Sequence, residues 1–248
     1  MAKQTLNEMM GNQTTEDEVE TPETAGAEVG APRTQYDNSK KFGADEVMTP
    51  RLMLAQGLSP AVQAGEAQPG QYLALGHDPV DEVVLVIAGH STKRRYSPDP
   101  SQAAQCFSPD GIQGFGEPGI PCETCPLSKW TDSGKKKPDG SPINVPPPCQ
   151  EIDSFACFSV THGMPVIWDL KGTAARSARF IKTLVNGLGM GQFALAITSA
   201  HMSKPGRAWY EPKVTLAKDL SPDECKVYAS IALGAVATAG AIAPTVDN

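Results

Sequence analysis

The sequence lacks the segments that direct a chain to or across a membrane. No apolar stretch follows Lys3 in residues 1–20, so we expect no secretory signal and a cytoplasmic protein. The longest apolar stretch, residues 227–243, is mostly Ala and Gly and is too short and too weakly apolar for a membrane span. It favours a helix packed through small residues. In a reducing cytoplasm, cysteines favour metal binding over disulfides.

Sequence signatures of catalysis are also missing. No His-x-Glu precedes the Cys-x-x-Cys at deaminase spacing, and the four histidines are scattered along the chain. Residues 114–116 (Gly-Phe-Gly) do not stand between a strand and a helix, as a phosphate-binding loop requires. We therefore expect no enzymatic activity. A zinc-dependent nuclease or deaminase is the less favoured alternative, because Glu123 lies between two thiols.

Residues 106–149 are rich in Gly and Pro and have almost no aliphatic periodicity, so burial alone would struggle to order them. This segment contains four of the six cysteines. Cys122 and Cys125 have the two-residue spacing of a zinc knuckle, and we predict that they bind one structural Zn²⁺ together with Cys106 and Cys149.

The outer two cysteines of this set are single and widely spaced, so other interpretations stay open. Pro121 and Pro126 flank the close pair and disfavour a redox Cys-x-x-Cys, which usually opens a helix. Independent buried thiols are the plainest alternative, and they fit Cys157 and Cys225.

Charge is unevenly distributed along the chain, whose net charge is −7. Residues 1–31 carry seven acidic side chains against Lys3, which predicts a disordered acidic tail that continues as a linker to residue 45. Residues 171–213 carry seven cations against Glu211 alone. We interpret this as a polyanion-binding surface that the tail can occupy in competition.

Most of the ordered elements predicted from the pattern are strands. Strands are expected at 71–75, 82–88, 155–160 and 164–170, and residues 193–197 and 209–214 should form a hairpin with a basic tip. A helix is expected at 173–186, and Ser221-Pro222-Asp223-Glu224 predicts the start of another. The fold class is therefore mostly β or α+β. Our first choice is an OB-like Greek-key barrel over residues 46–224, with a zinc-stapled insertion at 106–149 and one or two flanking helices. Residues 225–248 are expected to form a separate Ala/Gly-rich helix and tail.

Aromatic and basic residues interleave twice, at 93–96 and at 204–213, as in proteins that stack bases and contact phosphates without reading sequence. The candidate nucleic-acid-binding residues are Lys93, Arg94, Arg95, Tyr96, Trp130, Arg176, Arg179, Lys182, Lys204, Arg207, Trp209 and Tyr210.

The cysteine cluster, residues 165–173 (PVIWDLKGT) and residues 209–214 (WYEPKV) resemble bacteriophage single-stranded DNA-binding proteins of the zinc-containing, helix-destabilising type. The resemblance covers residues 49–224. The sequence departs from the T-even version of this family in three ways. In that version one zinc ligand is a histidine, the ligands are closer together in the sequence, and the acidic tail is C-terminal; here the acidic residues are N-terminal. The resemblance implies non-catalytic coating of single-stranded DNA during replication or recombination, with self-association and with replication or recombination proteins as partners. A zinc-stapled phage structural or adaptor protein is the alternative.

Overall fold

The computed structural model describes residues 48–99, 103–217 and 220–238. The chain divides into two compact units, residues 1–41 and 42–248, and all described residues belong to the second. The disorder predicted for residues 1–45 therefore concerns residues outside the described part. Within the described ranges, none of the helices has the length and apolar content needed to span a bilayer.

The described unit contains more strand than helix. Its helices are α1 (Pro60–Gln63), η1 (Pro126–Ser128), η2 (Gly172–Ala174), α2 (Ala175–Leu188) and α3 (Pro222–Thr238). Its strands are β1 (Arg51–Leu54), β2 (Tyr72–Leu73), β3 (Val83–Tyr96), β4 (Cys106–Ser108), β5 (Phe115–Gly116), β6 (Thr131–Lys136), β7 (Pro142–Val145), β8 (Cys149–Ser159), β9 (Met164–Lys171), β10 (Ala194–Lys204) and β11 (Arg207–Leu216).

Strand β3 is the centre of the main sheet. Its first residues pair with β10, its last residues pair with β4, and β8 pairs with it along most of its 14 residues. The resulting strand order is β11-β10-β3-β8-β9-β1-β2, and β1 joins β9 in parallel. A β-bulge lies between Ile87 and Gly89, where such an irregularity bends a strand.

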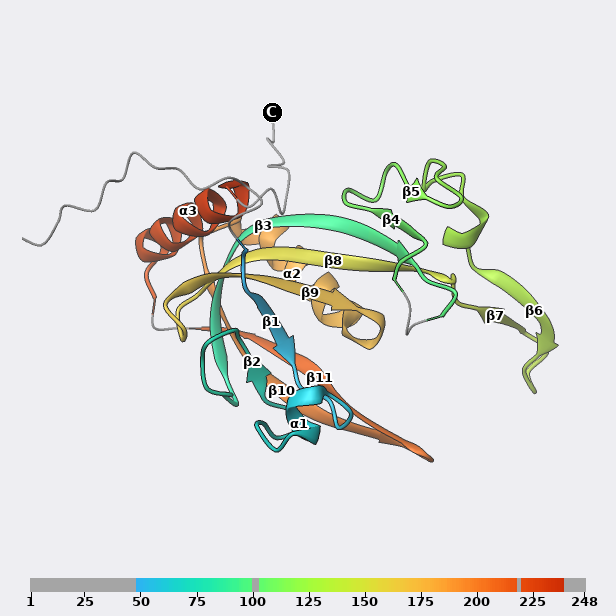
Figure 1. Cartoon of the computed structure of the whole chain (residues 1–248), viewed down its shortest axis with the longest axis horizontal. Coiled ribbons are helices and arrows are strands. Elements are labelled where there is room, and N and C mark those ends of the chain that lie inside the picture. Colours follow the sequence, from blue (N-terminus) through green and yellow to red (C-terminus); the bar gives the residue numbers. More distant parts are fainter. Residues whose placement is uncertain (1–47, 100–102, 218–219, 239–248) are drawn as a thin grey trace, which may run out of the picture. The chain divides into compact units, whose positions relative to one another are not determined.

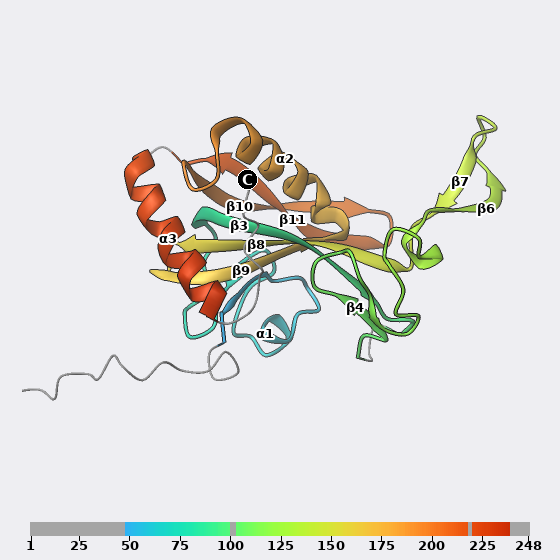
Figure 2. The ribbon, with the colours of Figure 1, turned by 90° about the horizontal axis from the view of Figure 1, so that it is seen from above.

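Alternation along β3 divides the apolar side chains between two cores. Val83, Leu85 and Ile87 are buried in the larger core, which also contains Ala178 and Ile181 of α2. Val86, on the other face, packs in a second core with Cys225, Ala229 and Ala232 of α3. The two helices therefore cover opposite faces of the strand, because successive side chains point to opposite faces. Figure 2 shows α2 and α3 against different parts of the sheet.

Helix α3 begins as the sequence predicts, but it does not form a separate segment from residue 225. Ser221 and Glu224 form a capping box: the Ser221 backbone N–H donates to Glu224 Oε2 at 2.9 Å, and the Glu224 N–H donates to Ser221 Oγ at 3.3 Å. The helix packs on the sheet, within the same compact unit as residues 42–224. The small side chains of α3 allow this close packing on β3 and β8.

The cysteine-rich segment is an insertion between two paired strands. Residues 97–148 leave β3 and return in β8, whose residues Cys149 to Ser154 pair with Tyr96 back to Ser91. Inside the insertion, β4 adds to the free edge of β3, β5 adds to β4, and β6 and β7 form a separate two-stranded sheet. Figure 1 shows β3 and β8 arching together towards β4 to β7.

The α+β, mostly strand fold class is confirmed. Strands also form where the pattern predicts them, including the hairpin of β10 and β11 with Lys204 and Arg207 paired at its tip. In the described ranges, no pair of hydrogen-bonded strands joins β11 to β9 or β2, so the observed sheet is an open path.

Candidate nucleic-acid interface

The four predicted metal ligands line one small cavity. Cys106, Cys122, Cys125 and Cys149 surround a space of about 10 Å³ between the insertion and the last residues of β3. Cys122 and Cys125 are each 7 % exposed and Cys149 is 9 % exposed. A space of this size accommodates one small sphere, such as a water molecule or a metal ion.

The sheet register brings the two distant cysteines to the same place. Tyr96 of β3 pairs with Cys149 of β8 on one side and with Cys106 of β4 on the other. Directly paired residues project to the same face of a sheet, so both thiols share a face with the Tyr96 ring, which also lines the cavity. Tyr96 therefore lies with the cysteines and does not contribute to the groove described below.

Local contacts fix the close pair against these strands. Ser128 Oγ lies 2.8 Å from the carbonyl oxygens of both Cys122 and Cys125. A Cβ atom on Gly114 would stand 3.0 Å from Cys106 Sγ, so this position favours glycine because the sulfur approaches the backbone so closely.

The environment of the cavity holds Cys149 in its thiol form when no metal is bound. Burial raises the pKa of Cys149, the Arg94 guanidinium lowers it, and the charges of the other three cysteines raise it further. Among the residues with described positions, no three His, Cys, Asp or Glu side chains stand in the arrangement of a formed metal site. The four thiols that line the cavity are the side chains that would hold a structural Zn²⁺, as thiolates.

A groove runs beside this centre, made of three adjoining cavities of about 920, 440 and 750 Å³. Arg207 lines the first and second, Tyr210 lines the second and third, and Lys171 lines the first and third. We call these three cavities the groove. They bring together residues of the insertion, β1, β9, η2 and the β10–β11 hairpin.

The hairpin supplies two aromatic side chains to the groove. Trp209 Nε1 donates to Glu211 Oε1 at 2.7 Å, and Lys204 Nζ lies 5.9 Å from the centre of the Trp209 ring. The Tyr210 ring packs so closely on Gly70 that a Cβ atom at that position would come within 2.7 Å of the ring. Both rings are thus held in place, which lowers the entropic cost of stacking a base on them.

Gln56 ties this hairpin to the segment after β1. Its Oε1 accepts from the Tyr210 backbone N–H at 2.9 Å, and its Nε2 donates to the Tyr210 carbonyl at 3.0 Å. One side-chain amide thus bridges β11 and the end of β1, where the sheet path leaves the two strands unpaired. Gln56 also lines the groove, and the sequence pattern gave no sign of this role.

The opposite wall comes from the insertion and from β8. Trp130, 65 % exposed, lines the 920 Å³ cavity with Arg94 and Lys171. Arg94 is paired with Glu151, and Arg51, which lines the third cavity, is paired with Asp169. Lys171, Lys204 and Arg207 have no carboxylate partner within the described part of the chain, so they are the cations available to phosphates.

The N-terminus of α2 also faces the groove. Thr173 and Ala175 line it, no side chain caps the helix at Ala174, and no acidic residue stands in the first turn. The unsatisfied backbone N–H groups of a helix start carry a partial positive charge that attracts anions. This feature adds to the cationic character of the groove.

The other predicted residues lie elsewhere. Lys93 is buried, and its pKa is lowered. Burial is the main cause; the charge of Asp169 opposes the shift, and the charge of Arg51 adds to it. Lys182 Nζ donates to buried Asp153 at 2.8 Å. Arg176 and Arg179 are exposed on α2 but do not line the groove. Arg95 follows Arg94 in β3 and therefore projects from the other face of the strand.

Six of the twelve predicted residues therefore meet in the groove, together with Lys171, which was not among the twelve. The six are Arg94, Trp130, Lys204, Arg207, Trp209 and Tyr210. The local excess of cations in residues 171–213 was the signal that pointed to Lys171.

Comparison with known proteins finds no matching family model, no matching curated protein and no matching solved structure.

Proposed function

We propose that this protein binds single-stranded DNA in the groove, without catalysis and without strong sequence preference, in the cytoplasm during replication or recombination. The observation that carries the proposal is the meeting of three aromatic rings with cations from distant segments. Trp130, Trp209 and Tyr210 offer faces for bases. Lys171 and Arg207 line the same groove and have no carboxylate partner among the described residues. Such grooves bind single strands because stacking and phosphate contacts serve every sequence.

The strand connectivity supports the proposal, because it agrees with an OB-type barrel. Five strands lie in the order β11-β10-β3-β8-β9, and α2 connects β9 to β10. We infer that β1 and Gln56 bridge the remaining gap between β9 and β11. The insertion then occupies the loop between the first two barrel strands, and the β10–β11 tip is the loop between the last two. In OB folds these two loops and the face between them bind oligonucleotides.

We further propose that Cys106, Cys122, Cys125 and Cys149 hold a structural Zn²⁺. Support comes from the common cavity that the four thiols line and from the scarcity of apolar burial in the insertion. Four thiolate ligands leave a tetrahedral ion with no open position, which favours a structural role over a catalytic one. Bound zinc would fix the insertion, and with it Trp130, against the groove.

The test is a salt titration of binding to a fluorescent oligo-dT beside the matching duplex, using protein of measured zinc content. We expect a strong preference for the single strand and an affinity that falls steeply with salt. Zinc-replete protein that binds neither strand would contradict the proposal and favour a structural or adaptor protein.

A matched pair of variants on one hairpin locates the site. Lys204→Gln removes a groove cation, and we expect weaker binding to every sequence with a salt slope that is smaller by about 1. Lys213→Gln makes the same change at an exposed position of β11 outside the groove and should leave the slope unchanged. Equal effects of the two variants would place the bound strand elsewhere.

A further inference from the structure

Four side chains form a row across the strands on the face opposite the cysteines. Gln150 of β8 pairs with Arg95 of β3, Arg95 pairs with Phe107 of β4, and Phe107 pairs with Phe115 of β5. Paired residues project to the same face, and the neighbouring row, which contains Tyr96, projects to the other. We call Gln150, Arg95, Phe107 and Phe115 the outer row.

The outer row is unusual for a protein surface. Phe107 is 41 % exposed and Phe115 is 61 % exposed, although phenylalanine is among the residues most often buried. Arg95 is exposed between Gln150 and Phe107, and within the described part of the chain its guanidinium has no hydrogen bond or ion pair. Two open aromatic faces beside a free cation are the pair of groups that binds a base and its phosphate.

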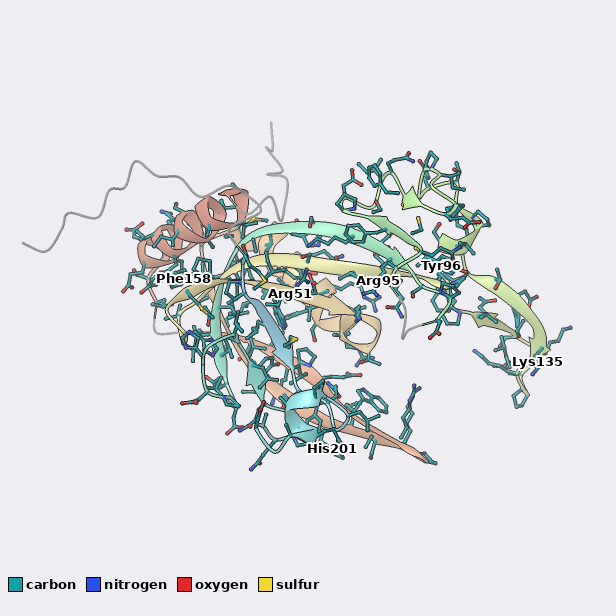
Figure 3. The ribbon with its side chains drawn as sticks, viewed as in Figure 1. Arg51, Arg95, Tyr96, Lys135, Phe158 and His201 are labelled. Carbon is teal, nitrogen blue, oxygen red and sulfur yellow. The ribbon has the colours of Figure 1, made fainter. Side chains whose placement is uncertain are left out.

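The outer row begins at the groove. Gln150 lines the 920 Å³ cavity together with Trp130 and Lys171. Strand β9 ends at Lys171, which pairs with Ile152, so residues 149–151 of β8 have no neighbour on that side. The groove therefore opens onto the edge from which the row starts. Figure 3 shows Arg95 near Tyr96, where β3 reaches the insertion.

We propose that the outer row is a second binding site for single-stranded nucleic acid, continuous with the groove. Adjacent strands lie about 4.8 Å apart, so the three steps from Gln150 to Phe115 span about 14 Å. In this site, bases stack on Phe107 and Phe115, and Arg95 contacts a phosphate. The inference rests on the proposed function of the groove, because the strand reaches the row by leaving the groove past Gln150.

The test compares oligo-dT of increasing length, from about 4 to about 16 nucleotides, on full-length protein. In the wild type, affinity should rise again once the strand is long enough to pass the groove. The double variant Phe107→Ala/Phe115→Ala should lose that second rise and bind the longest strand at least about tenfold more weakly, because each lost stack is worth about that much. Binding of the shortest strands should be unchanged.

Phe180→Ala is the matched control, since Phe180 is 45 % exposed on α2 and lies outside both sites. Zinc content and melting temperature should match the wild type in both proteins, because the substituted rings are exposed. A second readout uses 5-iododeoxyuridine in the long oligonucleotide: photocrosslinks should map to residues 107 and 115, and should vanish from the short one.

The outcomes separate this proposal from the function on which it rests. Wild-type affinity of the double variant for every length, with binding weakened in Lys204→Gln, would overturn the second site and leave the proposed function of the groove intact. A double variant that changes only the self-association of the protein would overturn it in favour of a contact between copies. A wild type that binds no oligonucleotide would overturn both.

Discussion

The long strands of the main sheet and the cysteine-rich insertion bury different kinds of side chain. In the strands, large apolar groups such as Leu85, Phe155 and Trp168 are at most 1 % exposed. Among the described residues of the insertion, 97–99 and 103–148, the most buried side chains are Ser108, Cys122 and Cys125, while Phe115 and Trp130 are more than half exposed. The strands therefore fold by removing apolar area from water, and the insertion needs another source of free energy.

The largest expected effect comes from breaking the proposed metal centre. Cys122→Ala should abolish zinc binding and leave β4 to β7 without ordered structure, because structural zinc sites supply about 10–16 kcal/mol in small domains. Residues 155–159 of β8 and 194–197 of β10, which pair with β3, should stay protected, since their core does not include the insertion. Hydrogen exchange measured by mass spectrometry resolves the two regions.

The control for this variant is Cys225→Ala, which removes a buried thiol from the packing of α3 and should leave the zinc content unchanged. Full protection of the insertion in metal-free Cys122→Ala protein would show that the insertion folds without zinc.

The reverse experiment weakens the strands and spares the insertion. Leu85→Ala empties a fully buried position of β3 and should lower the free energy of unfolding by about 2–5 kcal/mol, with zinc still bound under native conditions. Leu58→Ala, at a position 89 % exposed, should change it by less than about 0.5 kcal/mol. Chemical denaturation measures the free energy, and zinc analysis measures the metal. Loss of zinc in folded Leu85→Ala protein would show that the two regions are not independent.

A smaller effect is expected from a polar group inside the strands. Asp153 Oδ1 accepts from His90 Nε2 and Lys182 Nζ, each at 2.8 Å. Burial raises the pKa of Asp153, but the hydrogen bonds and charges of these two partners outweigh it and leave the pKa below its ordinary value. Asp153→Asn should lower the free energy of unfolding at pH 7 by about 1–3 kcal/mol.

The pH dependence of that effect has a definite sign. Because the folded pKa of Asp153 is depressed, its stabilisation is complete above the ordinary aspartate pKa of about 4 and is lost as pH falls through the folded value. Asp153→Asn should therefore flatten the loss of stability in acid, measured by denaturation at several pH values. An unchanged acid limb would show that Asp153 does not contribute to it.

The sequence predicts the strands better than it predicts the site. Apolar runs located β9 and the second half of β8, and alternation located the start of β10. The Lys204–Arg207 tip of the hairpin followed from the Pro-Gly turn. Local sequence patterns could not predict which way the side chains point at the end of β3, because the pairing of β3 with β4 and β8 decides which cation is buried. Lys93, Arg94 and Arg95 look alike in sequence, yet one is buried, one faces the groove and one faces outwards.

The outer row shows the same limit more clearly. Phe107 and Phe115 lie in strands of three and two residues inside a segment rich in Gly and Pro, where periodicity carries no signal. Only the register between β3, β4 and β5 aligns them with Arg95. The cysteines differ in this respect, because the Cys-x-x-Cys spacing is a local signal that can be seen in the sequence. The pairing of β3 with β4 and β8 then brings Cys106 and Cys149 to the same place.

The smallest expected effect concerns α3, which covers the strands with small side chains and begins at a local signal. Ser221→Ala removes the hydroxyl that accepts the Glu224 N–H, and should lower the free energy of unfolding by about 1 kcal/mol without changing zinc content. Ser230→Ala is the control on the same helix, because Ser230 Oγ bonds only the Lys226 carbonyl within the helix. A loss in Ser221→Ala no larger than in Ser230→Ala, by thermal or chemical denaturation, would show that packing on Val86 and Phe158 alone fixes the helix start. The expected difference instead makes α3 a part of the sheet unit that depends on its cap, in contrast to an insertion for which we propose dependence on a metal.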